Sequence, residues 1–429
     1  MKIGFLYIRS PDDDDPIPEL VFGCLKAYLD KYLDNSVDMF RLNPDNLHEC
    51  DVVAMSTLSQ DFGTAKIIAQ DIKQKHPAAS IIMGGQHVTW LHETLIPEMD
   101  FAVIGEGEQT FLELIRYFIN GKKEEDLFKI NGIVFWKDGV LVTNPRRELI
   151  ENLDDLPHPF REDLYKANNR HIFTSRGCAF KCSFCSSAAF WKKIRFHSAD
   201  YVVDEIESLR NIGTGNIPVM DDLFVANKRR FAEIIEKLKK KGLDKDYKMV
   251  IQVTAHYVTD ELIEILKGFR VIDRVIFSSE SGCDRILKSI GKGTTVAMNQ
   301  AVTDKLYDAG ISCGTSWIVG WPGETEAELR ETCRWIKKNG RKKFPMQASF
   351  NILMPLPGTK VWNDAVRSGL IDIKTFDWNR LKIWAPQGNF PGWETWKNAR
   401  KHYNTIYLNE RFIPQEKLYT ILEEEGFFN

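Results

Sequence analysis

The chain has 429 residues, and its 57 Lys and Arg nearly balance its 60 Asp and Glu, which leaves a net charge of −3. This balance argues against a nucleic-acid surface, and no apolar run reaches the length of a transmembrane helix. The 43% of hydrophobic residues is enough for two domains with separate cores. No signal peptide precedes the first apolar strand, and five of the eight Cys are scattered singly, so we expect a cytoplasmic protein.

Strands and helices alternate over the first 120 residues. Short apolar runs predict strands at 2–8, 36–42, 51–56, 80–84 and 101–105, and helical spacing predicts helices at 20–32, 63–75 and 110–119. Because the strands are apolar throughout, the pattern predicts a parallel, doubly wound sheet of the Rossmann-like kind. Each strand ends in a loop of small or polar residues, and ligands of such sheets bind beyond the carboxyl ends of the strands.

A hairpin and a second alternating region follow. Residues 131–146 predict a hairpin around Asp138 and Gly139, and the Pro- and Asp-rich stretch 152–159 is typical of a linker. Further strands are predicted at 171–175, 216–220, 249–254, 275–279, 312–319 and 347–353, with helices at 202–211, 230–240, 260–267, 301–309 and 326–338. These six βα units are too few for an eight-fold barrel.

The last stretch carries no barrel pattern and predicts a small helical extension. It is rich in aromatic residues that either line a pocket or pack the extension on the barrel, namely Phe376, Trp378, Trp384, Phe390, Trp393 and Trp396. We therefore divide the chain into a first domain at 1–135, a linker at 136–165, a second domain at 166–368 and the extension at 369–429.

Three clustered cysteines, Cys178, Cys182 and Cys185, have the spacing C-x3-C-x2-C. Three thiolates this close can hold a cubane iron–sulfur cluster and leave one iron open, which distinguishes the site from a four-Cys electron-transfer cluster. Open coordination positions mark reactive metal centres. Two plainer interpretations are buried structural cysteines and a zinc site with His197 as a fourth ligand, although the spacing is not that of a zinc finger.

Residues 174–185 resemble the cluster loop of the radical SAM enzymes, in which S-adenosylmethionine (SAM) binds the open iron and is cleaved to a 5′-deoxyadenosyl radical. The resemblance implies a 4Fe-4S cluster on the three cysteines and a partial (β/α)6 barrel. Two further segments, 275–282 and 318–325, resemble strand ends of that barrel, and Met220–Phe224 also ends a predicted strand. The SAM-binding residues implied in these segments are Phe184, Asp221, Glu280, Ser281, Gly320 and Pro322.

Each of these segments also has a structural interpretation. Glu280 at a strand end also fits a surface salt bridge. Glu324 and Thr325 suit the start of a helix, and Asp221 and Asp222 suit the cap of the next helix.

Residues 1–130 resemble the cobalamin-binding domain that is fused to many radical SAM enzymes. The resemblance rests on the loops after the third, fourth and fifth strands and implies cobalamin contacts from Thr57, Leu58, Ser59, Gln60, Gly84, Gly85, His87, Thr89, Gly105, Glu106, Gly107 and Glu108. Relatives with a cobalt-binding histidine carry Asp-x-His-x-x-Gly after the first strand, but residues 9–16 here contain no histidine. We therefore expect His87 to be a hydrogen-bonding or turn histidine rather than a cobalt ligand. The acidic loop at 12–18 departs from the family pattern.

Together the resemblances imply a cobalamin-dependent radical SAM C-methyltransferase with a 4Fe-4S cluster, SAM and cobalamin as cofactors. In that chemistry the deoxyadenosyl radical removes hydrogen from an unactivated carbon, methylcobalamin donates its methyl group, and a second SAM remethylates the cobalt. A flavodoxin or ferredoxin would supply electrons, and the substrate would be a small molecule or a peptidyl residue such as glutamine. A radical SAM cyclase, oxidase or rearranging enzyme, with cobalamin in another role or with a vestigial cobalamin domain, is the alternative. A methylthiotransferase is disfavoured, because Cys24 and Cys50 do not make a second three-Cys site.

Overall fold

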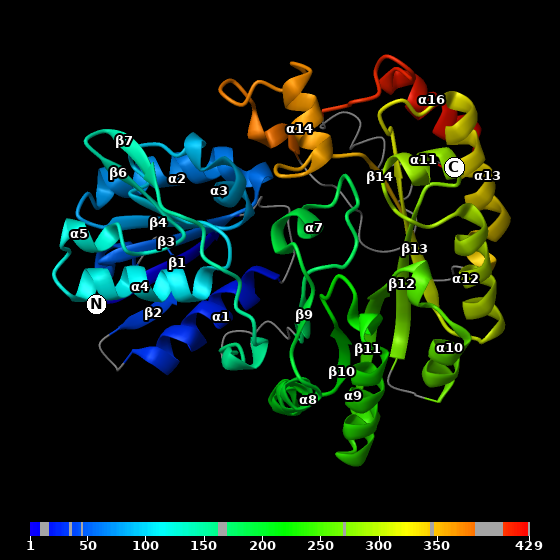
Figure 1. Ribbon diagram of the computed structural model, residues 1–429, viewed down its shortest axis with the longest axis horizontal. Coiled ribbons are helices and arrows are strands. Elements are labelled where there is room, and N and C mark those ends of the chain that lie inside the picture. The colour runs from blue at the N-terminus through cyan, green and yellow to red at the C-terminus, as the bar shows by residue number, and fades with distance from the viewer. Residues whose placement is uncertain are drawn as a thin grey trace. The chain divides into compact units, whose positions relative to one another are not determined.

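The computed structural model describes residues 1–8, 17–33, 37–43, 46–161, 170–268, 272–343, 347–381 and 406–427. These residues form two compact units (Figure 1). The first unit holds the described residues up to 161 and adds Val366–Asn379, and the second holds the remaining described residues from Arg170 onward. The domain boundary expected after residue 135 falls inside a strand, and the expected extension from 369 onward is shared between the two units.

The first unit is built on a seven-stranded sheet of order β2-β1-β3-β4-β5-β6-β7. Its first five strands are parallel, as expected: β1 (Lys2–Ile8), β2 (Asp38–Arg41), β3 (Val52–Thr57), β4 (Ser80–Gly84) and β5 (Phe101–Val103). The predicted hairpin is confirmed as β6 (Ile133–Lys137) and β7 (Val140–Thr143), and it extends this sheet antiparallel to β5. The order 2-1-3-4-5 is that of a doubly wound sheet, whose ligands bind where the strand order reverses.

Helices cover both faces of this sheet (Figure 1). On one face α1 (Ile17–Tyr32) and α4 (Gly107–Ile119) share an apolar core with β1, β3 and β5, and α5 (Glu124–Leu127) adds Leu127 to it. On the other face lie α2 (Phe62–Lys75) and α3 (Gln86–Leu91), which bury Phe62 and Val88. Because β3 is covered from both sides, all six of its residues are buried, as an apolar parallel strand requires.

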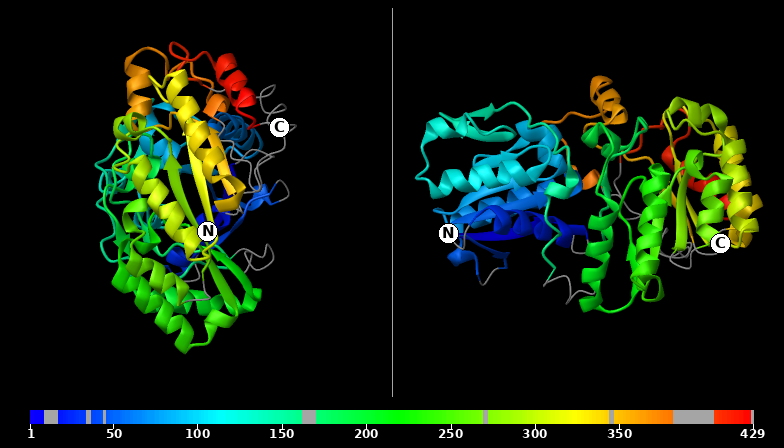
Figure 2. Two further views of the ribbon diagram at one scale, coloured as in Figure 1. Left: turned by 90° about the vertical axis from the view of Figure 1, so that its right-hand side faces the viewer. Right: turned by 60° about the horizontal axis from the view of Figure 1, so that its bottom comes forward.

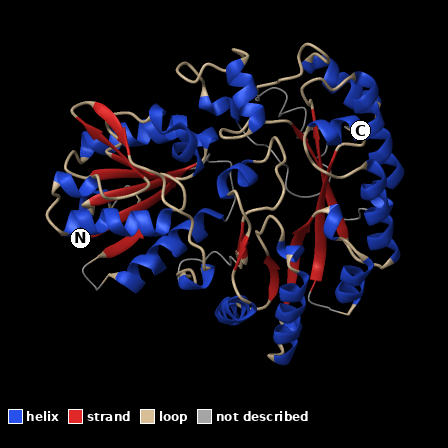
Figure 3. Ribbon diagram, in the orientation of Figure 1, coloured by secondary structure: helices blue, strands red, loops and turns tan. Residues whose placement is uncertain are grey.

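The second unit contains five parallel strands in chain order, flanked on the outside by helices (Figure 3). The strands are β10 (Gly215–Pro218), β11 (Tyr247–Val253), β12 (Ile272–Glu280), β13 (Cys313–Val319) and β14 (Gln347–Ile352). The helices that connect them are α8 (Ala199–Ser208), α9 (Lys228–Lys240), α10 (Asp260–Lys267), α11 (Asp284–Ser289), α12 (Val296–Asp308) and α13 (Glu326–Lys343). Such an unreversed order is the arrangement of a partial barrel.

The prediction of a first barrel strand at 171–175 was wrong. Ile172 makes a single parallel bridge to Val219, and the chain then turns into the two-residue strand β8 (Ser175–Arg176), which pairs antiparallel with β9 (Arg195–Phe196). The reason is a side chain that is distant in sequence, since the backbone amides of Thr174 and Ser175 donate to the carboxylate of Asp221 instead of to a neighbouring strand.

The end of the chain belongs to both units. After β14 come α14 (Lys360–Arg367) and the segment that packs in the first unit, whereas α16 (Gln415–Glu424) lies beside α13 in the second (Figure 2). Arg330 of α13 forms ion pairs with Glu424 and Glu425 that fasten α16 there. Trp384, Phe390, Trp393 and Trp396 lie outside the described residues. Among the described helices, none has the length and hydrophobicity to span a bilayer.

Candidate functional site

The three clustered cysteines lie on the loop that follows β8. Gly177 precedes them with φ +96°, and a Cβ there would come within 2.3 Å of the Lys193 carbonyl oxygen, so only glycine fits this turn. The Cys185 amide donates to the Cys182 carbonyl oxygen at 3.2 Å, and α7 (Ser186–Trp191) begins at the next residue. The loop is therefore fixed at both ends and presents partly exposed thiols between them.

The thiols fit a cluster better than a single ion. Burial raises the pKa of all three, of Cys178 to about 11. The charges of Cys182 and Cys185 also raise the pKa of Cys178, and the charge of Cys185 raises that of Cys182, so the three thiols lie close together. Within the described part of the chain, no three His, Cys, Asp or Glu side chains converge as they would on one metal ion. A cube binds its cysteines through different irons, so its ligand sulfurs need not converge. His197, the expected zinc alternative, stacks on Tyr201 with ring centroids 3.8 Å apart.

Asp221 holds the base of this loop. Its buried carboxylate accepts hydrogen bonds from the amides of Thr174 and Ser175 at 2.6 and 3.1 Å, and from their hydroxyls at 2.5 and 2.7 Å. Burial raises the pKa of Asp221, while these hydrogen bonds oppose that rise. All its acceptor directions are thus used within the protein, which makes it a positioning residue and does not support the expected contact with SAM. Capping is not its role either, because Asn227 caps α9.

Arg230 also holds Thr174, and the sequence alone did not reveal this contact. Its guanidinium donates to the carbonyl oxygens of Thr174, at 2.7 Å, and His197, at 2.5 Å. Thr174 is therefore bonded through its amide, hydroxyl and carbonyl groups.

Glu280 stands at the end of β12 in a strained conformation. It has φ +64°, which is rare for a residue other than glycine, and the pairing of β12 with β13 shifts register beside it. Its carboxylate forms an ion pair with Lys292 at 2.9 Å, and the two side chains are only 6% and 11% exposed. Burial lowers the pKa of Lys292, but Glu280 and Cys182 outweigh it, so this pKa lies above its usual value. The surface salt bridge of the plainer interpretation is thus a buried pair beside the cysteine loop.

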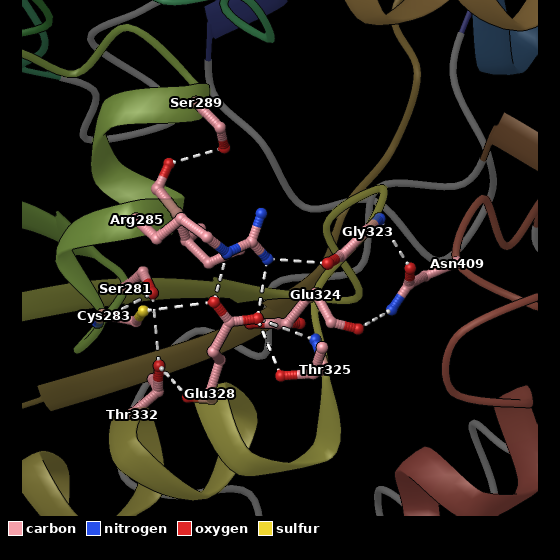
Figure 4. A network of polar contacts seen from close by, with 11 residues as sticks. Ser281, Cys283, Arg285, Ser289, Gly323, Glu324, Thr325, Glu328, Thr332 and Asn409 are labelled. Atoms are coloured by element: carbon pink, nitrogen blue, oxygen red, sulfur yellow. Dashed lines mark hydrogen bonds and ion pairs between the residues drawn. The ribbon is translucent and has the colours of Figure 1, made fainter.

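The segment 318–325 forms the loop from β13 to α13 (Figure 4). Trp321 packs against Phe184 of the cysteine loop, with ring centroids 5.0 Å apart. Glu324 accepts from the amides of Gly320 and Trp321 at 2.7 and 3.3 Å, and burial raises its pKa to about 8. Pro322 is exposed at the tip. The predicted helix start is also present, because the Glu328 carboxylate accepts from the Thr325 amide at 2.9 Å, as in one half of a capping box, and from the Thr325 hydroxyl at 2.8 Å.

Ser281 is engaged in this network rather than open to a ligand. Its hydroxyl contacts the Thr332 hydroxyl at 3.3 Å and accepts from the Cys283 amide at 3.2 Å (Figure 4). Arg285 joins the loop by donating to the Gly323 carbonyl oxygen at 2.7 Å and to Glu328. The Arg285 guanidinium lowers the pKa of Glu328 to about 2.

The three expected cobalamin loops of the first unit separate into buried and accessible residues. Leu58, Gln60, Gly84, Gly85, Gly105 and Gly107 are at least partly exposed, whereas Thr57, Ser59, His87, Thr89, Glu106 and Glu108 are buried. Gly85 has φ +100°, and a Cβ there would come within 2.5 Å of the Thr57 carbonyl oxygen, while open space lies beside Gly105. An edge lined by backbone fits a large ligand that must approach closely.

The buried residues brace these loops. The Thr89 hydroxyl donates to the Gly85 carbonyl oxygen at 2.9 Å and accepts from the Gly105 amide at 3.1 Å. Glu106 accepts from the Ile150 amide at 2.8 Å. Their side chains therefore position the glycines, and the backbone is left to contact a ligand.

Both ring nitrogens of His87 lie within hydrogen-bond distance of hydroxyl groups of the first unit. Its Nδ1 lies 3.0 Å from the Ser59 hydroxyl and its Nε2 lies 2.9 Å from the Thr94 hydroxyl. The ring stacks on Phe62 at 3.7 Å and meets the edge of Trp378 at 4.6 Å. Both ring nitrogens of His87 therefore have hydrogen-bond partners within the protein, and Trp378 of the aromatic segment packs against the ring.

We expect His87 to make the first unit sensitive to acid. Burial lowers its pKa from 6.5 to about 3, so its stabilising effect is complete above pH 6.5 and is lost as the pH falls toward 3. The loss between pH 7 and pH 5 should be about 2 kcal/mol. Urea unfolding at the two pH values, followed by hydrogen exchange of residues 57–62, measures it. His87→Phe should flatten this pH dependence, and His48→Ala, an exposed histidine of the same unit, should not; equal slopes for His87→Phe and wild type would contradict the assignment.

Comparison with known proteins gives two family matches. Residues 172–336 match the Radical SAM superfamily and residues 46–115 match the B12 binding domain. A methyltransferase of Pyrococcus horikoshii, PH0819, is 31% identical over 88% of this chain and 82% of its own length. The anaerobic magnesium-protoporphyrin IX monomethyl ester cyclase of Rubrivivax gelatinosus is 26% identical over 85% of this chain and 67% of its own. The structure of the cobalamin-dependent S-adenosylmethionine radical enzyme OxsB with aqua-cobalamin bound shares the fold, with a TM-score of 0.72, 19% identity, and coverage of 99% of this chain and 71% of that one.

Proposed function

We infer the reaction of this chain from its family. The chain belongs to the radical SAM enzymes that carry an N-terminal B12-binding domain, and among these to the cobalamin-dependent methyltransferases. Its cofactors are a 4Fe-4S cluster, SAM and cobalamin. We propose that it methylates an unactivated carbon. When bound, these cofactors supply a radical that removes hydrogen and a methyl group that replaces it.

One observation carries this proposal: a three-cysteine loop braced by Asp221 and a glycine-lined sheet edge braced by Thr89 occur in one chain. The first arrangement leaves one iron open, and the second leaves backbone free for a large ligand. The protein's share is to hold both groups, orient the substrate and exclude water. A flavodoxin or ferredoxin is the electron donor that we propose.

For the substrate we propose a peptidyl residue such as glutamine as the first to test, because the two-unit plan is compact. A cyclase or oxidase is the second candidate, and the similarity to the Rubrivivax gelatinosus cyclase favours it. Mass spectrometry of the product separates the two candidates. Each methylation replaces a hydrogen by a methyl group, which adds one CH₂, or about 14 mass units.

The experiment that tests the cofactor set is anaerobic purification and reconstitution with iron, sulfide and cobalamin. We expect about one cobalamin per chain, bound without a histidine nitrogen on the lower cobalt face, because both nitrogens of His87 are occupied. Electron paramagnetic resonance of the cob(II)alamin state reads this directly. Superhyperfine splitting by a nitrogen nucleus in this spectrum would contradict a lower cobalt face without a histidine nitrogen. A chain that retains no cobalamin would favour the second candidate, the cyclase or oxidase.

We also propose that Glu280 orients SAM, since its strained backbone and its buried partner Lys292 lie beside the cysteine loop. Glu280→Gln should weaken SAM binding at least tenfold because it loses the charge but keeps the shape, and iron content should stay that of the wild type. Equilibrium dialysis with labelled SAM measures the affinity. Glu261→Gln on exposed α10 is the matched control; an unchanged affinity of Glu280→Gln would refute this role.

A further inference from the structure

The chain returns to the barrel after the undescribed stretch, and residues 406–413, the return segment, lie against the loop from β13 to α13. The Gly323 amide donates to Asn409 Oδ1 at 2.9 Å, and Asn409 Nδ2 donates to the Glu324 carbonyl oxygen at 2.8 Å (Figure 4). Asn409 is completely buried. One side chain thus satisfies a donor and an acceptor on two successive residues of that loop, through the separate oxygen and nitrogen of its primary amide.

Two neighbours of Asn409 touch the same loop. The ring of Tyr407 lies so close to Gly320, which has φ +76°, that a Cβ there would come within 2.7 Å of it. Leu408 packs on the apolar group that contains Trp321, and Phe184 of the cysteine loop packs on the same group. Tyr407 and Asn409 therefore contact the loop at its start and its end, and Leu408 between them packs on the apolar group to which Trp321 belongs.

The return segment is itself rigidly held. The Asn409 carbonyl oxygen accepts from the amides of Phe412 and Ile413 at 3.0 Å each, and Ile413 is fully buried in the barrel core. Next comes α16, which is fastened to α13 by the ion pairs of Arg330. The loop rests on a fixed support that is far from it in sequence, which is how a binding loop is kept in one geometry.

We propose that Asn409 and Tyr407 are positioning residues that hold the Gly320–Glu324 loop in the shape that receives SAM. This inference rests on the proposed function, because it assumes that SAM binds at this loop. The loop alone has conformational freedom at Gly320 and Gly323, both with positive φ. The return segment removes that freedom before SAM arrives, so it lowers the cost of ordering the loop on binding.

The test uses the full chain, reconstituted with iron and sulfide, and measures SAM affinity by equilibrium dialysis. Asn409→Ala should weaken SAM binding at least tenfold. Asn409→Asp should do the same, because it keeps the acceptor for Gly323 but sets a second oxygen against the Glu324 carbonyl. Iron per chain should not change, and hydrogen exchange of residues 320–324 without SAM should speed up. Arg411→Ala, an exposed side chain on the same turn, should match the wild type.

Both Asn409 variants with a SAM affinity within twofold of wild type would overturn the proposal. So would a loss of iron in parallel with the loss of SAM, since that would indicate general unfolding. If Asn409→Ala gives no folded protein, two variants of Tyr407 provide the test. Tyr407→Phe keeps the ring on Gly320 and should bind SAM with wild-type affinity, whereas Tyr407→Leu should bind SAM at least fivefold more weakly. Equal SAM affinities of these two variants would overturn the inference. A wild-type chain that binds no SAM would instead refute the proposed function, and with it the premise here.

Discussion

Replacing Cys182 by Ala should abolish cluster-dependent cleavage of SAM and remove most of the bound iron. The same is expected for Cys178→Ala and Cys185→Ala, because each thiolate holds a different iron and the chain supplies only three. Two remaining thiolates do not keep a cube. Iron and sulfide analysis after anaerobic reconstitution, together with the yield of 5′-deoxyadenosine under a strong reductant, measures both effects.

Cys24→Ala is the matched control, since this partly exposed thiol lies on α1 in the other unit. It should keep the iron content and the cleavage rate of the wild type. A triple variant of Cys178, Cys182 and Cys185 that still held a full cluster would contradict the assignment of the loop.

Replacing Asp221 by Ala should have the largest effect on stability of any change away from the cysteines. The variant leaves two amides and two hydroxyls buried without their acceptor, which costs about 3–5 kcal/mol. Because Thr174 and Ser175 lead directly into the cysteine loop, we also expect slower cluster incorporation. Urea unfolding of the iron-free chain measures the first effect, and the time course of reconstitution measures the second.

Asp221→Asn should be milder, because its amide oxygen still accepts from both backbone amides while the two hydroxyls turn to accept from its nitrogen. Asp200→Ala on α8 is the control, because it removes only an exposed ion pair to Lys237 of α9, and it should change stability by less than about 1 kcal/mol. If Asp221→Ala unfolded at the urea concentration of the control, the bracing role of Asp221 would be wrong.

Most elements of both sheets could be predicted from the sequence because their signals are local. Apolar runs such as Val52–Thr57 and helical patterns such as Asp260–Lys267 carry their periodicity within a few residues. The strand expected at 171–175 failed for a reason that no local pattern contains: its amides are taken by Asp221, which is 46 to 47 residues away. Predicting that these amides bond to Asp221 rather than to a neighbouring strand requires knowing the fold beforehand.

The candidate site could be predicted where its residues recur at a characteristic spacing along the sequence. The cysteine triplet and the glycine pairs stand out in the sequence, whereas their supports do not. Lys292, Arg230 and Asn409 act on groups 12 to 86 residues distant, and an isolated Lys, Arg or Asn gives no sign of such a partner. The return of Val366–Asn379 to the first unit is long-range in the same sense, and it brings Trp378 against His87 of the expected cobalamin loops.

The most direct test of the central claim is whether the protein moves the methyl group of SAM onto cobalamin. The reconstituted, reduced wild-type chain is incubated with SAM that carries a deuterated methyl group. The protein-bound cobalamin is then extracted, and its mass is measured by mass spectrometry. A cobalamin-dependent methyltransferase predicts labelled methyl on the bound cobalamin, with S-adenosylhomocysteine released in equal amount, and no label when cobalamin is omitted. Cobalamin that stays bound but never acquires the label, in a preparation that cleaves SAM to 5′-deoxyadenosine, would contradict the account.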